Sequence, residues 1–142
     1  IRKFQPEVVL INAISDRHPD HGKGDTLAKE ACFLSGLRKI DTGQDAWRPK
    51  SVYHYIQDYY MKPDMVVDIT AEVEQKIETI KAFKTQFWDP DSKEPQTPIS
   101  GEEFFEVLKG RWRDFGRYIG AEFGEGFVLT RPAGVEQITD IY

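Results

Sequence analysis

Two of the chain's three histidines lie in one short segment, residues 16–22, whose sequence is Asp-Arg-His-Pro-Asp-His-Gly. His18 and His21 are three positions apart, which is close to one helical turn, so both imidazoles can face the same side of a helix. Such a pair can bind a metal ion, or one ring can bind the metal while the other handles a proton. A catalytic zinc site needs about three protein ligands. The segment offers two good ones at most, so it predicts part of a metal site.

The neighbours of the pair favour a chemical role, although an isolated pair at this spacing is more often a surface or structural feature. A ligand histidine commonly donates its second ring N–H to a carboxylate, and Asp16 or Asp20 could accept it. The positive end of a helix dipole disfavours an imidazolium ion, which suits a metal ligand. The residue types therefore permit metal binding, with one carboxylate orienting a ring.

The segment is expected to follow a buried strand and to begin a helix. Residues 8–12 form a short apolar run that is typical of a strand in a parallel sheet. A helix is predicted from Pro19 to about Arg38, because proline suits the first helical position. Strand, loop and helix make half of a βαβ unit. Ligands of open α/β sheets bind at the carboxyl ends of strands, where this pair lies.

The rest of the chain predicts further strands and helices of an α/β protein. Strands are expected at residues 51–56, 65–69 and 126–129. One helix is expected over residues 71–87, with Thr70 as its N-cap. Another follows Ser100, with Glu103 completing a capping box, and ends at Gly120 or Gly124.

Composition limits the function classes. The chain has 142 residues, the size of one ordinary domain, and 39% of them are hydrophobic, enough for a packed core. A formal charge of -5 argues against broad nucleic-acid binding or binding to an anionic membrane. No apolar run reaches the roughly 18 residues of a membrane span. The single cysteine, Cys32, excludes an internal disulfide, and we expect a cytoplasmic protein.

The motif and its surroundings resemble the LmbE/PIG-L family. Residues 12–22 resemble the second metal motif of that family, and His-Pro-Asp-His is the most specific part of the likeness. The likeness continues through residues 31–40, 47–58, 63–70, 80–87 and 124–127. It implies a Rossmann-like α/β fold and zinc-dependent deacetylation of N-acetylglucosaminyl compounds. The nearest branch acts on N-acetylglucosaminyl-malate in bacillithiol biosynthesis.

The resemblance implies roles for individual residues. His21 matches the zinc ligand of the motif. His18 matches the histidine beside the metal that assists the reaction by electrostatics or proton donation. Asp20 matches the carboxylate that tunes the histidines, while Arg17 and Arg48 are expected to shape the site.

This sequence departs from the family pattern in two ways. It does not contain the first motif, Ala-His-Pro-Asp-Asp, which supplies two further ligands and the general base. We expect that motif before Ile1, which makes residues 1–142 the C-terminal part of one such domain, lacking the N-terminal strands and inactive alone. Some members place an oxyanion-binding tyrosine where Asp16 stands, and an ionised carboxylate cannot donate that hydrogen bond. We also expect a homo-oligomer.

Other functions remain open from the residues alone. The chain could be a non-catalytic binding or assembly module of the same fold, or another metal-dependent hydrolase that acts on phosphate esters. His54, between two tyrosines, is expected to be a packed or partly exposed strand residue rather than a ligand. Cys32 is expected to be an inert core residue.

Overall fold

A computed structural model of the protein describes residues 1–141, which form two compact units. The first unit contains residues 1–65 together with the segment that follows residue 125, and the second contains residues 66–125. The two histidines of the motif, His18 and His21, lie in the first unit.

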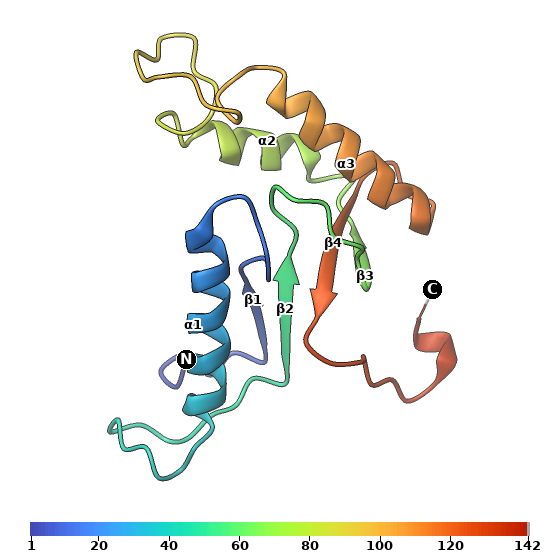
Figure 1. Cartoon of the computed structure of the whole chain (residues 1–142). Coiled ribbons are helices and arrows are strands. Elements are labelled where there is room, and N and C mark those ends of the chain that lie inside the picture. The colour runs from blue at the N-terminus through green and yellow to red at the C-terminus, as the bar shows by residue number, and fades with distance from the viewer. Residues whose placement is uncertain (142) are drawn as a thin grey trace. The chain divides into compact units, whose positions relative to one another are not determined.

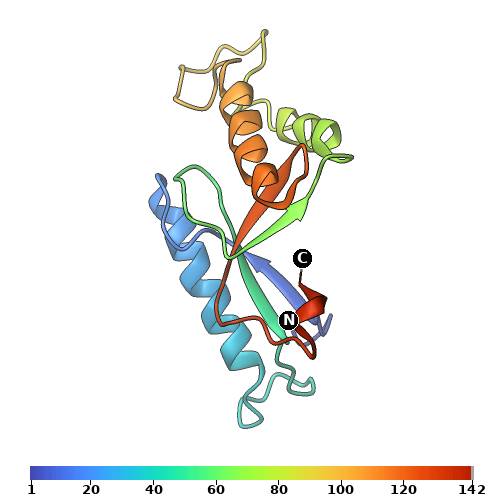
Figure 2. The same cartoon turned by 90° about the vertical axis from the view of Figure 1, so that its right-hand side faces the viewer.

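The first unit is built on a βαβ arrangement. Strand β1 (Val8–Ile11) leads through a loop into helix α1 (Pro19–Ser35), and the chain returns in strand β2 (Ser51–Tyr55). The strands β1 and β2 are parallel, with Ile11 opposite His54, and α1 lies along them in both views (Figure 1, Figure 2). The predicted strand–loop–helix arrangement is therefore confirmed.

Alternation along β1 separates a buried face from an exposed one. Ile11 on β1 and Cys32 on α1 are among the buried apolar residues of this unit. Val8 and Leu10 point to the other face, because side chains alternate along a strand, and more than half of each is exposed. The apolar strand thus has only one well-covered face among the described residues.

Strand β4 (Gly124–Leu129) passes from the second unit into the first. Its last residues pair antiparallel with β2, with His54 opposite Val128. In the second unit it neighbours strand β3 (Met65–Asp68), and the strand order is β1-β2-β4-β3. The sheet is consequently mixed rather than wholly parallel.

The second unit packs two helices over its strands. Helix α2 (Val73–Lys81) and helix α3 (Phe104–Ile119) contribute most of its core. The apolar residues of α3 recur at helical spacing, which gives one buried stripe. The buried core consists of Ile69, Val73, Ile77, Phe105, Leu108, Trp112 and Phe123.

Three predicted helix boundaries are wrong. Helix α1 ends at Ser35 rather than near Arg38, and α2 covers 73–81 rather than 71–87. Thr70 does not cap α2, because the helix begins at Val73 and Glu72 occupies the N-cap position. The hydroxyl of Thr70 instead accepts the Phe123 N–H at 3.1 Å.

The predicted capping box of α3 is also wrong, although the predicted end of the helix is confirmed. The hydroxyl of Ser100 lies 2.8 Å from the amide of Thr97, and Glu103 is the N-cap without a side-chain bond. Gly120 ends the helix with φ of 72°, a left-handed conformation that glycine adopts without steric cost.

Within the described residues, no helix has the length and apolar character needed to cross a membrane.

Candidate functional site

The loop after β1 delivers the two histidines to the start of α1. His18 is the N-cap, in an extended conformation, and Pro19 is the first helical residue. The ring nitrogen Nδ1 of His18 accepts the backbone N–H of Asp20 at 3.2 Å. This bond satisfies one of the free amides at the helix start, a task usually performed by a serine, threonine, aspartate or asparagine oxygen.

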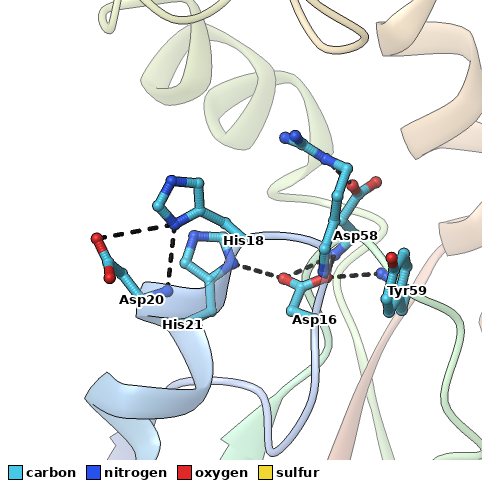
Figure 3. A network of polar contacts seen from close by, with 7 residues as sticks. Asp16, His18, Asp20, His21, Asp58 and Tyr59 are labelled. Carbon is cyan, nitrogen blue, oxygen red and sulfur yellow. Dashed lines mark hydrogen bonds and ion pairs between the residues drawn. The ribbon is translucent and has the colours of Figure 1, made fainter.

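His21 lies in the first turn of α1, beside His18. Its ring nitrogen Nδ1 is 2.7 Å from Oδ2 of Asp16. The two ring centroids are 5.5 Å apart and the rings are tilted by 40°. The structure therefore brings the two imidazoles together at the carboxyl end of β1, as the spacing predicts (Figure 3).

Asp16 is the centre of the polar contacts around the motif. Its side chain is fully buried, and its carboxylate accepts the backbone N–H groups of Arg17 at 2.8 Å and Tyr59 at 2.9 Å. The Asp58 amide lies at 3.2 Å. Burial acts to raise the pKa of Asp16, but the bonds from Tyr59, His21, Arg17 and Asp58 outweigh it and hold the pKa below its ordinary value. The carboxyl group is accordingly ionised at neutral pH.

Arg17 makes a second contact between the motif and the loop after β2, in addition to the bonds that Asp16 accepts from that loop. Its Nε lies 2.6 Å from Oδ2 of Asp58, in a half-exposed ion pair. Asp58 and Tyr59 were not predicted as site residues. Their position in the sequence is enough to predict them as site residues. Both follow β2, and the carboxyl ends of neighbouring parallel strands meet at one edge of a sheet.

Asp20 lies on the other side of the two rings from Asp16 (Figure 3). Its Oδ1 pairs with Nζ of Lys23 at 3.1 Å, and its Oδ2 is 3.9 Å from Nδ1 of His18. The hydrogen bond and the charge of Lys23 lower the pKa of Asp20. Asp20 is thus an exposed neighbour of His18.

Arg48 lies elsewhere. Its guanidinium is 4.7 Å from the ring centre of Phe33, and Nη2 donates to the Phe33 carbonyl oxygen at 2.9 Å. Phe33 belongs to the end of α1, and a helix rises 1.5 Å per residue, so this contact is roughly 20 Å along the axis from His18. The structure brings Arg17, Asp20 and the histidines together, and it does not bring Arg48 to them.

No protein-family model matches this sequence. The solved structures that are similar to the chain include the following three. A conserved protein of Thermus thermophilus is 29% identical, with a TM-score of 0.81, and the match covers 96% of this chain and 57% of that one. GalB, the 4-carboxy-2-hydroxymuconate hydratase of Pseudomonas putida, is 22% identical with a TM-score of 0.74, at the same coverages. The N,N'-diacetylchitobiose deacetylase of Pyrococcus horikoshii is 27% identical with a TM-score of 0.68, covering 91% of this chain and 47% of that one.

The α/β fold expected from the LmbE/PIG-L resemblance is confirmed. Its neighbours include a deacetylase with this fold, whereas the hydratase, at 22% identity, supports the fold alone. The chain spans about half the length of the solved structures that it matches, at 57%, 57% and 47%.

The described residues fit one part of a metal site. His21 has Nδ1 against a carboxylate, the arrangement that ligand histidines commonly have, which leaves Nε2 for a metal. No group of three or more His, Cys, Asp or Glu side chains among residues 1–141 could hold an ion together. The segment can therefore contribute a ligand but does not form a complete site by itself.

Proposed function

We propose that this chain belongs to a zinc-dependent hydrolase that removes the acetyl group from an N-acetylglucosaminyl compound and releases acetate. The observation that carries the proposal is the pair of imidazoles at the carboxyl end of β1, each with Nδ1 engaged by its own segment. The similarity to a deacetylase of chitobiose, at 27% identity, supports the same reaction type. The LmbE/PIG-L resemblance favours N-acetylglucosaminyl-malate as the substrate.

His18 is suited to handle a proton. Because Nδ1 accepts the amide hydrogen of Asp20, the ring proton of neutral His18 lies on Nε2. About half of the side chain is exposed, so Nε2–H can reach a bound substrate. There the neutral ring would donate a hydrogen bond to the oxygen of the attacked acetyl group. To give a proton to the departing amine, the ring would first take up a second proton at Nδ1, which breaks its bond from the Asp20 amide.

His21 would hold zinc through Nε2. When bound, zinc supplies Lewis-acid polarisation of an acyl carbonyl and of water. The resemblance assigns two further ligands and the general base to an Ala-His-Pro-Asp-Asp motif, which these 142 residues do not contain. We propose that a segment outside the present sequence supplies them.

Arg17 would contribute to substrate binding. Its Nε is engaged by Asp58, which fixes the plane of the guanidinium. A guanidinium has five N–H donors, and those on the Nη atoms suit a bidentate bond to a carboxylate. A malate group, which carries two carboxylates, offers such an acceptor.

Identification of the products tests the proposal. The complete protein that contains this chain would be loaded with Zn²⁺ and incubated with N-acetylglucosaminyl-malate, and separately with a sugar phosphate ester. We expect acetate and free amine in equal amounts, loss of the reaction after chelation, and its return with Zn²⁺. Release of phosphate without acetate would instead identify a phosphate-ester hydrolase.

A further inference from the structure

Two carboxylates flank the histidine pair, and only one of them makes a close contact to a ring. Asp16 Oδ2 is 2.7 Å from His21 Nδ1, whereas the nearest oxygen of Asp20 is 3.9 Å from His18 Nδ1. By position, the family resemblance gives the tuning role to Asp20. The distances favour Asp16 for His21.

The contacts at Nδ1 fix the two neutral rings as different tautomers, with the proton on a different nitrogen in each. An ionised carboxylate only accepts hydrogen bonds, so the proton shared with Asp16 belongs to Nδ1 of His21 and its Nε2 keeps a lone pair. His18 is the reverse, because its Nδ1 accepts the Asp20 amide and the proton of the neutral ring lies on Nε2. One ring therefore presents an acceptor and the other presents a donor.

We propose that Asp16 is the positioning residue of this site, fixing His21 so that its Nε2 lone pair faces the metal. The inference rests on the proposed function for the identity of the metal. Asp16 itself would touch neither metal nor substrate, and it would act only through His21.

The surroundings of Asp16 make it a rigid support. Its carboxylate is fully buried and accepts three backbone N–H groups, which restrict its rotation. Two of these amides, from Asp58 and Tyr59, belong to the loop after β2, 42 and 43 positions further along the chain. The orientation of His21 is thereby coupled to a loop that is distant in the sequence. Asp20 is mostly exposed and paired with Lys23, so it offers no comparable restraint.

The substitution Asp16→Asn distinguishes two roles of Asp16: holding the backbone amides around it, and accepting the proton of His21 Nδ1. The amide oxygen can still accept the backbone N–H groups, which supports the local fold. The amide NH₂ then faces His21 Nδ1 as a donor, which moves the ring proton to Nε2 and blocks the lone pair. Loss of such an orienting partner typically weakens metal binding about 10- to 100-fold.

The test uses the complete protein that contains this chain, labelled with ¹⁵N, with its histidine ring nitrogens observed by NMR in the absence of metal and during titration with Zn²⁺. We expect Nδ1–H on His21 and Nε2–H on His18 in the wild type. In Asp16→Asn we expect Nε2–H on His21 and an affinity for Zn²⁺ that is lower by about 10- to 100-fold. Asp20→Asn is the matched control. We expect it to keep Nδ1–H on His21 and to change the affinity for Zn²⁺ by less than about threefold, because the carboxylate of Asp20 is exposed.

Nε2–H on His21 in the wild type would overturn the proposal, and this spectrum does not depend on the folding of any variant. Measurable Zn²⁺ binding with equal affinity in the wild type and Asp16→Asn would also overturn it. A complete wild-type protein that shows Nδ1–H on His21 but binds no Zn²⁺ would count against the proposed function, while the spectrum would still support the contact of Asp16 with His21.

Discussion

Nδ1 of His54 lies 2.8 Å from Oδ1 of Asp25, and both residues are almost completely buried. The same nitrogen is 3.1 Å from the carbonyl oxygen of Asn12, at the end of β1. The other oxygen of Asp25, Oδ2, pairs with Nζ of Lys29 at 2.8 Å. Because Asp25 is one helical turn after His21, these contacts fix the start of α1 against β1 and β2.

We predict that His54→Ala destabilises the protein by about 3 kcal/mol, because it leaves a buried carboxylate without the one buried group that contacts it. Urea unfolding followed by circular dichroism would measure the change. Lys29→Ala is the control, since its side chain is 42% exposed, and we expect a loss below about 1 kcal/mol. Equal stability of His54→Ala and the wild type would show that the buried contact contributes nothing.

We predict that two Gly→Ala changes in α3 have opposite effects. At Gly116 a Cβ would lie 2.8 Å from the Ala121 carbonyl oxygen and 2.9 Å from the Phe123 carbonyl carbon, which are backbone atoms that cannot easily move. Gly116→Ala should therefore cost about 1–3 kcal/mol. Gly110 has nothing within 4 Å of such a Cβ, so Gly110→Ala should gain about 0.5–1 kcal/mol from helix propensity.

Urea unfolding of both glycine variants under the same conditions would measure this difference. The two variants share one helix and one chemical change, so each controls for the other. A gain in stability at Gly116 would contradict the close packing of α3 against the chain before β4.

Cys32 should be a slow nucleophile. It is the only cysteine and is buried, and burial raises the pKa of its thiol, which lowers the thiolate fraction at neutral pH. We predict slow reaction with a thiol reagent such as DTNB in native buffer and prompt reaction of one thiol per chain in denaturant. Rapid labelling of the native chain would contradict the burial of this face of α1.

The parts of the site that the sequence predicted are local ones. The apolar run before the motif, Pro19 and the spacing of His18 and His21 are sufficient to predict a strand, a helix start and two adjacent rings. The contacts of Asp16 with Asp58 and Tyr59 join residues 42 and 43 positions apart. Such contacts depend on the register of β1 and β2, which no local pattern specifies. The same limit explains Thr70, whose hydroxyl is used by Phe123 rather than by the helix that follows it.

The central claim is that the two histidines have different roles, with His21 binding zinc and His18 handling a proton. The most direct measurement is zinc content together with kcat for His21→Ala and His18→Ala in the complete protein that contains this chain. We predict that His21→Ala loses tightly bound zinc, whereas His18→Ala keeps it and loses about 10²- to 10⁴-fold in kcat. Full zinc occupancy and normal turnover in His21→Ala would contradict the account.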